Sequence, residues 1–202
     1  MKFMKQIVLI RGWESKENYK DFYDYLKKEK FDPYKEKTRR WNRNLWNTLW
    51  DDYEVLEIPM PNRHFADYKA WKIMFEKIIP YLKDDVILVG HSLGWTFLTK
   101  YFEEENAEKL LEKTKKIILV APWFKDDEKE VLWNFNFDKD LKKIKKIEEE
   151  ITIFGSKDDF LVDFSDIEDY KKVLPNVKYK IFENKWHFLQ EDFDELIEEI
   201  KK

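Results

Sequence analysis

One serine of the chain lies in a sequence pattern that is typical of enzyme nucleophiles. Ser92 is the centre of Gly90-His91-Ser92-Leu93-Gly94, and the chain has only four glycines in 202 residues. The apolar run 85–89 before it is typical of a buried strand, and a helix-like stretch follows. In a nucleophile elbow the turn is so tight that a side chain two residues from the serine would meet neighbouring backbone. The pattern therefore predicts an elbow with Ser92 as nucleophile, and an ordinary turn with a helix-capping serine is the alternative.

A serine hydroxyl needs a histidine base at neutral pH, and the chain has three histidines. His91 lies inside the elbow, and we expect its side chain to point away from Ser92. His64 follows the second expected strand, before the acid loop in sequence. His187 follows the last expected strand, in the order Ser, Asp, His that this architecture uses. His187 is therefore the predicted base.

The carboxylate that orients the base should follow the fifth expected strand, where Asp158 and Asp159 are adjacent. Most such pairs form solvated turns, and only one of the two can face the histidine. We favour Asp159, because its spacing to Val162 lets the apolar residues that follow pack under the acid. Asp158 remains the alternative acid.

Two backbone N–H groups are needed to bind the developing oxyanion. One is that of Leu93, directly after the nucleophile. The other should come from the loop after the first strand, where Trp13 is favoured and Glu14 is the alternative. Trp13 can also serve as a wall of the substrate pocket. Three other tryptophans are candidates for the same pocket, with core or lid packing as the alternative: Trp95, Trp123 and Trp186.

Expected strands and helices alternate along the chain, which predicts an α/β fold with a parallel sheet covered on both faces. Residues at the carboxyl ends of such strands form the site. The expected strands are 6–10, 53–58, 85–89, 116–121, 151–154 and 177–182. The expected helices are 17–30 with Ser15 as its cap, 67–82, the elbow helix to about 104, a helix opened by the capping box 165–168, and 193–200.

Length and composition indicate one domain, 1–202, and exclude several classes of function. Charged residues make up 40% of the chain, but they are interleaved and the net charge is −4, so neither nucleic acid nor a membrane surface is an expected partner. The lack of cysteine excludes disulfides, thiolate metal sites and cysteine nucleophiles. The apolar stretch 6–10 is too short for a signal peptide, and no run reaches transmembrane length, so we expect a cytoplasmic protein.

Two segments look like inserts or cap elements, 31–52 and 123–146. Trp46 and Trp50 in the first are four residues apart, which predicts one apolar face of an added helix that packs on the body or covers the site. Mixed basic and aromatic residues there can also stack on nucleic acid, but the helix is the simpler interpretation. The second insert is rich in aromatic residues, which suits either a pocket wall or core packing.

These motifs together resemble the small serine hydrolases of the retinoblastoma-binding protein nine and YdeN type. The resemblance rests on 11–13, 59–62 with Trp71, 90–94, 154–159 and 186–188, and it covers nearly the whole chain. It implies a compact α/β-hydrolase with its triad at Ser92, Asp159 and His187. The chain departs from the family in three places: the first-strand loop lacks a glycine run, Trp186 replaces the usual glycine, and no proline follows Asp159.

The sequence thus predicts an α/β-hydrolase that cleaves a small carboxylic ester or thioester through an acyl-enzyme at Ser92. Such chemistry needs neither a metal ion nor an organic cofactor. The alternative is a catalytically silent hydrolase fold that serves as a protein-binding module, if Trp186 or the loop of Asp158 and Asp159 holds His187 away from Ser92. The sequence does not determine the oligomeric state.

Overall fold

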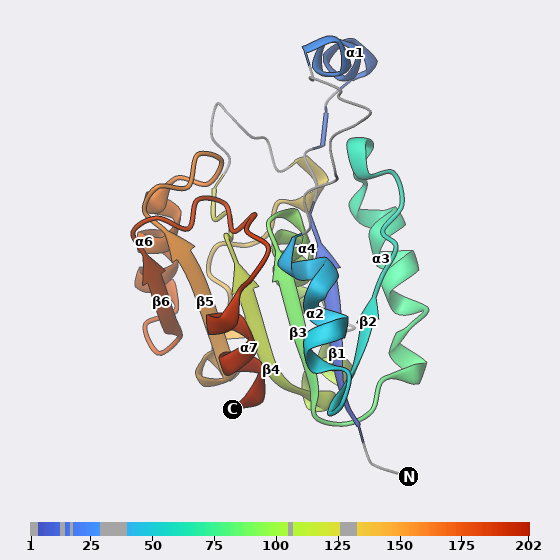
Figure 1. Ribbon diagram of the computed structural model, residues 1–202, viewed down its shortest axis with the longest axis vertical. Helices are drawn as coiled ribbons and strands as arrows, with labels where there is room; N and C mark the ends of the chain where they lie inside the picture. The colour runs from blue at the N-terminus through green and yellow to red at the C-terminus, as the bar shows by residue number, and fades with distance from the viewer. Residues whose placement is uncertain (1–3, 13–14, 17, 29–39, 105–106, 126–132) are drawn as a thin grey trace.

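The protein is built around a six-stranded parallel sheet (Figure 1). The computed structural model describes residues 4–12, 15–16, 18–28, 40–104, 107–125 and 133–202. The strand order is β2-β1-β3-β4-β5-β6, and every neighbouring pair is parallel, which confirms the predicted α/β sheet. The strands are β1 (Lys5–Arg11), β2 (Tyr53–Glu57), β3 (Val86–His91), β4 (Thr114–Val120), β5 (Ile151–Ser156) and β6 (Lys178–Phe182).

Helices cover both faces of the sheet. In Figure 1, α2 and α7 lie in front of it, and the Trp41 ring in α2 packs in a T-shaped arrangement with Phe193, the residue before α7. On the other face, Phe97 of α4 contacts Trp71 and Phe75 of α3. The α-helices are α1 (Tyr19–Lys28), α2 (Trp41–Leu49), α3 (Tyr68–Glu76), α4 (Leu93–Glu103), α5 (Glu108–Lys113), α6 (Phe164–Val173) and α7 (Asp194–Lys201). Short 3-10 helices are η1 (Arg63–Phe65), η2 (Ile79–Tyr81), η4 (Trp133–Phe135) and η5 (Ile144–Glu150).

The central strands are buried on both sides, as their continuous apolar sequences require. All six residues of β3 are buried, and so are Ile7–Ile10 of β1. Because both faces carry helices, a polar alternation would place unpaired side chains in the core. This burial holds β3 rigidly, and therefore also holds the turn that follows it.

Two of the expected helix caps are wrong. Ser15 does not cap α1; its Oγ accepts a hydrogen bond from Ala66 N–H at 2.8 Å and ties two loops together. The cap of α6 is Asp163, which accepts from Ser165 N–H at 2.8 Å, so the box expected at 165–168 lies inside the helix. Ser15 is used by a contact with another loop, and Asp163 is an acceptor closer to the first turn of α6 than Ser165 is.

The first insert contains the expected helix, α2, but its packing face differs from the prediction. Trp41, Leu45 and Leu49 are buried, whereas Trp46 is 44% and Trp50 is 68% exposed. The buried residues are also four apart, so periodicity alone fits either stripe. The leucine stripe packs on the body and leaves the two tryptophans outside. Residues 31–39 of this insert lie outside the described part of the chain.

The second insert contributes aromatic side chains to the core where it is described. Trp123 and Phe124 are buried after β4, and Phe135 and Phe137 are buried further along. Phe135 meets the Trp71 ring edge-on with the centroids 5.1 Å apart. Core packing therefore accounts for these four residues, and 126–132 fall outside the described ranges.

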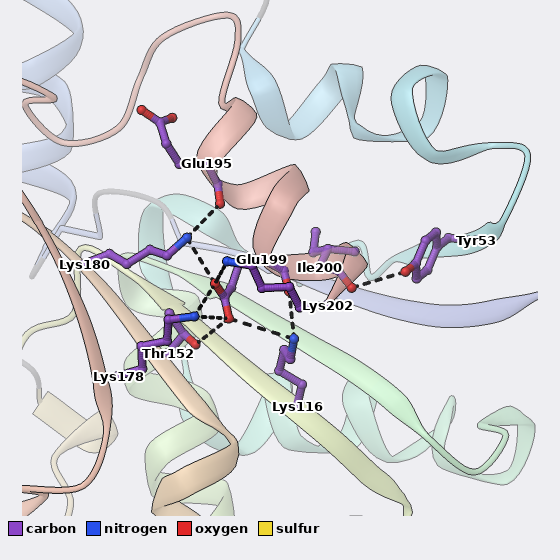
Figure 2. A network of polar contacts seen from close by, with 9 residues as sticks. All are labelled: Tyr53, Lys116, Thr152, Lys178, Lys180, Glu195, Glu199, Ile200 and Lys202. Carbon is purple, nitrogen blue, oxygen red and sulfur yellow. Dashed lines mark hydrogen bonds and ion pairs between the residues drawn. The ribbon is translucent and has the colours of Figure 1, made fainter.

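Figure 2 shows a polar network that fastens α7 to the sheet, and it is centred on the buried Glu199. The Nζ atoms of three lysines lie close to its carboxylate oxygens: Lys178 at 2.8 Å, Lys180 at 3.0 Å and Lys202 at 3.3 Å. Lys116 Nζ donates to the backbone carbonyl of Glu199 at 2.7 Å. Burial acts to raise the pKa of Glu199, but the hydrogen bonds from the lysines outweigh it and lower the pKa to about 2. The network lies toward the amino ends of β4 and β6 and stabilises the end of the sheet opposite the elbow.

Among the residues that the structure describes, no helix is both long and apolar enough to cross a membrane.

Candidate active site

Ser92 occupies a strained turn between β3 and α4. Its backbone has φ 55° and ψ −128°, a region that residues with a side chain rarely adopt. The turn is held by the Ser92 N–H, which donates to the carbonyl of Val120 at 2.9 Å, and by the Trp95 N–H, which donates to the Ser92 carbonyl at 2.9 Å. Such strain persists only where surrounding contacts impose it, and it raises the serine side chain above the carboxyl end of the strand.

The glycines on either side of Ser92 are required by close backbone approach. A Cβ on Gly90 would lie 2.8 Å from the Cα of Trp95, and one on Gly94 would overlap the carbonyl oxygen of Ile10. Neither neighbour is a flexible side chain that could move aside. The turn therefore has the close packing that the Gly-x-Ser-x-Gly pattern predicts.

His187 and Asp159 form a buried pair on the loops after β6 and β5. His187 Nδ1 lies 2.9 Å from Asp159 Oδ2 and 3.1 Å from Oδ1. Asp159 Oδ1 also accepts the N–H groups of Leu161 at 2.9 Å and Val162 at 3.0 Å, which fix the carboxylate. Because a carboxylate only accepts, Nδ1 is the nitrogen that donates, which leaves Nε2 as the ring nitrogen that can accept a proton. The pair thus has the orientation that a general base requires.

Asp158 makes different contacts, although it is adjacent to Asp159. Its Oδ1 accepts the hydroxyl of Ser156 at 2.6 Å and the backbone N–H of Trp186 at 2.9 Å. The Ser156 Oγ in turn accepts the Lys185 N–H at 2.9 Å. Asp158 therefore holds the backbone just before His187, and Asp159 holds the imidazole.

The two residues that flank His187 both have a left-handed backbone. Trp186 has φ 49° and Phe188 has φ 53°. Glycine adopts this conformation most readily, so Trp186 and Phe188 both hold it against the steric preference of a side chain. Phe188 is fully buried against Phe193, whereas the Trp186 side chain is 63% exposed. The Trp186 side chain is therefore accessible next to the buried His187.

The loop that carries His187 lies against the elbow. The His91 ring, next to Ser92, is 5.1 Å from the His187 ring between centroids, and its Nε2 lies 3.0 Å from the His187 carbonyl oxygen. In the part of the chain that the structure describes, no hydrogen bond joins Ser92 Oγ to the His187 ring. Contacts between nucleophile and base are often long without substrate and shorten in the reacting complex.

The predicted oxyanion donors are placed only in part. Leu93 is the first residue of α4, so its N–H belongs to the first turn of the helix, where no backbone carbonyl of the helix accepts it. Gly12, at the end of β1, donates its N–H to the His91 carbonyl at 2.7 Å, which brings the first-strand loop against the elbow. Trp13 and Glu14 lie outside the described residues, so the second donor remains a prediction.

The tryptophans proposed for the pocket differ in exposure. Trp95 is completely buried, with its ring 5.3 Å from that of Tyr170, so it packs the core and does not line an open pocket. Trp123 is also buried, and its Nε1 donates to the Leu161 carbonyl at 3.4 Å, beside the acid loop. Phe160, which sequence reasoning missed, is exposed and 6.3 Å from the His187 ring between centroids. Its position directly after Asp159 is the signal that could have identified it.

Within the described ranges, no three His, Cys, Asp or Glu side chains come together as a metal site would require.

A parallel sheet with helices on both faces, and a serine in a strained turn after a central strand, define an α/β-hydrolase. The comparisons agree with this class. A family model described as serine hydrolase matches residues 34–190, so the chain belongs to the serine hydrolase family and is an enzyme of the hydrolase type.

Solved structures show the same fold. The ydeN gene product from B. subtilis is 20% identical with a TM-score of 0.70, and the match covers 98% of this chain and 100% of that one. A putative yden-like hydrolase from Pectobacterium atrosepticum is 16% identical with a TM-score of 0.58, over 92% and 80% of the two chains. The esterase EaEST from Exiguobacterium antarcticum is 15% identical with a TM-score of 0.55, over 100% and 94%. No curated protein sequence matches the chain.

Proposed function

We propose that this hydrolase cleaves a small carboxylic ester or thioester, with Ser92, His187 and Asp159 as its triad. The observation that carries the proposal is the buried hydrogen bond of 2.9 Å between His187 Nδ1 and Asp159, on a loop that lies against the strained elbow of Ser92. A buried imidazole that is oriented by a carboxylate beside a serine hydroxyl is the arrangement that activates that hydroxyl.

In the proposed reaction, Ser92 Oγ attacks the carbonyl carbon while His187 Nε2 takes the hydroxyl proton. The negative charge on the carbonyl oxygen is held by the N–H groups of Leu93 and Trp13. The tetrahedral intermediate then expels the alcohol or thiol, which takes the proton from His187 and leaves an acyl group on Ser92. A water molecule then attacks this acyl group while His187 takes its proton; collapse of the second intermediate breaks the bond to Ser92 Oγ, which takes the proton back from His187 as the acid leaves. Asp159 keeps the imidazole in the required tautomer and stabilises its charged form in both steps.

The surroundings of the base support a substrate with an apolar part. Trp186 and Phe160 are exposed aromatic side chains on the two loops that bring His187 and Asp159 together. Apolar groups beside a few polar ones are typical of small-molecule sites. The structural neighbour from Exiguobacterium antarcticum is an esterase, which is consistent with an ester substrate.

A catalytically silent binding module is the second candidate, because no hydrogen bond joins Ser92 to the His187 ring within the described residues. The two candidates differ in one simple property, which is turnover of an activated ester at Ser92.

The test is steady-state hydrolysis of p-nitrophenyl esters from acetate to octanoate, and of an acyl thioester, by the parent and Ser92→Ala. We expect turnover by the parent and a loss of at least about a thousandfold in kcat for Ser92→Ala. Ser165→Ala is the matched control, because Ser165 lies in α6 and its hydroxyl accepts from Lys125 on the surface. Equal turnover by the parent and Ser92→Ala would refute the proposed nucleophile, and a folded parent without turnover would favour the binding module.

A further inference from the structure

The first residue of α2, Trp41, is bound to the loop that carries His187. Its indole Nε1 donates to the carbonyl of Phe188 at 2.8 Å, in a buried hydrogen bond. Its backbone N–H donates to the carbonyl of Gln190 at 3.0 Å. The helix of the first insert thus begins directly behind the base, 147 residues away from Phe188 in the chain.

A second donor reaches the same loop from the elbow. His91 Nε2 lies 3.0 Å from the carbonyl oxygen of His187, and because a carbonyl only accepts, Nε2 carries the proton. Burial, and next the nearby His187, lower the pKa of His91 to about 3, so the ring stays neutral. The Trp41 and His91 rings pack in a T-shaped arrangement, with centroids 5.7 Å apart. The two donors therefore support each other.

These contacts provide hydrogen-bond donors for backbone carbonyls of the loop around His187. Trp186 and Phe188 have left-handed φ values, so the loop turns sharply around His187 and its carbonyls are not used by a strand ladder. A buried carbonyl without a partner is destabilising, so each carbonyl needs a donor from another segment. Trp41 and His91 supply donors to the carbonyls of 187, 188 and 190.

We propose that Trp41 and His91 form a clamp on these carbonyls that positions the imidazole of His187. Neither side chain is assigned a contact with reacting atoms, so both are positioning residues. The inference rests on the proposed function, in which His187 is the base, and it gives the first insert a role in the site. His91 also links the nucleophile and the base directly, since the residue before Ser92 holds the backbone of His187.

The kinetic test compares Trp41→Phe, His91→Leu and His91→Gln. Trp41→Phe keeps an aromatic ring but removes the indole N–H, and His91→Leu removes the ring donor. We expect kcat to fall between about tenfold and about a hundredfold in both, with a smaller change in KM, because misplacement of the base affects the reacting geometry. His91→Gln places an amide N–H near the position of Nε2 and should restore kcat to within about threefold of the parent. Trp50→Phe is the matched control, since it makes the same chemical change at an exposed position directly after α2.

A second readout needs no turnover. The proton on His187 Nδ1, bonded to Asp159, should give a low-field proton NMR signal that disappears in His187→Ala. We expect this signal in the parent, His91→Gln and Trp50→Phe, and its loss or broadening in Trp41→Phe and His91→Leu while thermal unfolding shows that both are folded. An unchanged signal in Trp41→Phe and His91→Leu would overturn the clamp whether or not the parent hydrolyses esters. A failure of the proposed function alone would show as absent turnover with the signal changing as expected.

Discussion

Exchange of the Asp159 carboxylate for an amide should stop catalysis without disturbing the loop. Asp159 Oδ1 accepts the N–H groups of Leu161 and Val162, so the amide carbonyl oxygen introduced by Asp159→Asn would occupy that place. The amide NH₂ would then stand at the position of Oδ2, 2.9 Å from His187 Nδ1. Two donors cannot share a hydrogen bond, so His187 would adopt the tautomer with its proton on Nε2. In that tautomer Nε2 already carries a proton, so it cannot accept the proton of the Ser92 hydroxyl.

The expected magnitude follows from this tautomer change. Asp159→Asn should lower kcat by about 10⁴, the loss expected when the carboxylate of a serine triad becomes an amide. Asp158→Asn should stay within about threefold, because its carbonyl oxygen can still accept from Ser156 and Trp186. Asp158→Ala removes this acceptor and should lower kcat about tenfold by releasing the backbone before His187.

The assay is kcat on p-nitrophenyl butyrate together with the rate constant of labelling by a fluorophosphonate, and thermal unfolding confirms that each variant is folded. A loss of about a thousandfold in Asp158→Asn, with activity kept in Asp159→Asn, would contradict the role of Asp159. That result would assign the acid to Asp158, the alternative that the sequence leaves open.

Three further predictions concern stability. Trp186→Gly should be more stable than Trp186→Ala by about 1 kcal/mol in urea unfolding, because φ at this position is 49°, and equal stability would contradict the strain. Glu199→Gln should lower the free energy of unfolding by about 3 kcal/mol at pH 7. Because the pKa of Glu199 is lowered to about 2, its charged form stabilises the fold fully above the usual pKa of 4.5. The difference in free energy of unfolding between the parent and Glu199→Gln should therefore shrink as the pH falls from 4.5 toward 2. A difference that does not change with pH would argue against stabilisation by the charge. Gly94→Ala should destabilise the fold by about 3 kcal/mol or prevent folding, since its Cβ would overlap the carbonyl of Ile10, and parent-like urea unfolding would be inconsistent with this packing.

The sheet and the elbow could be predicted from the sequence because their signals are local. Continuous apolar runs indicate strands that are buried on both faces. Glycine is needed at 90 and 94 because neighbouring backbone leaves no room there for a Cβ atom. The order of serine, aspartate and histidine along the chain then placed the candidate residues at the carboxyl ends of β3, β5 and β6.

The rest depends on contacts between distant segments. Adjacent aspartates look alike in sequence, and only the partners of each show that Asp159 faces the imidazole while Asp158 faces the backbone. The apolar stripe of α2 was assigned one residue out of register, because Leu45 and Leu49 have the same spacing as Trp46 and Trp50. Trp95 follows the elbow closely enough to suggest a pocket, yet the first turn of α4 directs it into the core.

The most direct test of the activation of Ser92 by His187 is intact-protein mass spectrometry after reaction with a fluorophosphonate, with the labelled peptide identified. We expect one phosphonyl group on Ser92 in the parent, none in Ser92→Ala, and labelling slowed by at least about a thousandfold in His187→Ala. A folded parent that remains unlabelled, or that is labelled as fast without His187, would contradict the claim that His187 activates Ser92.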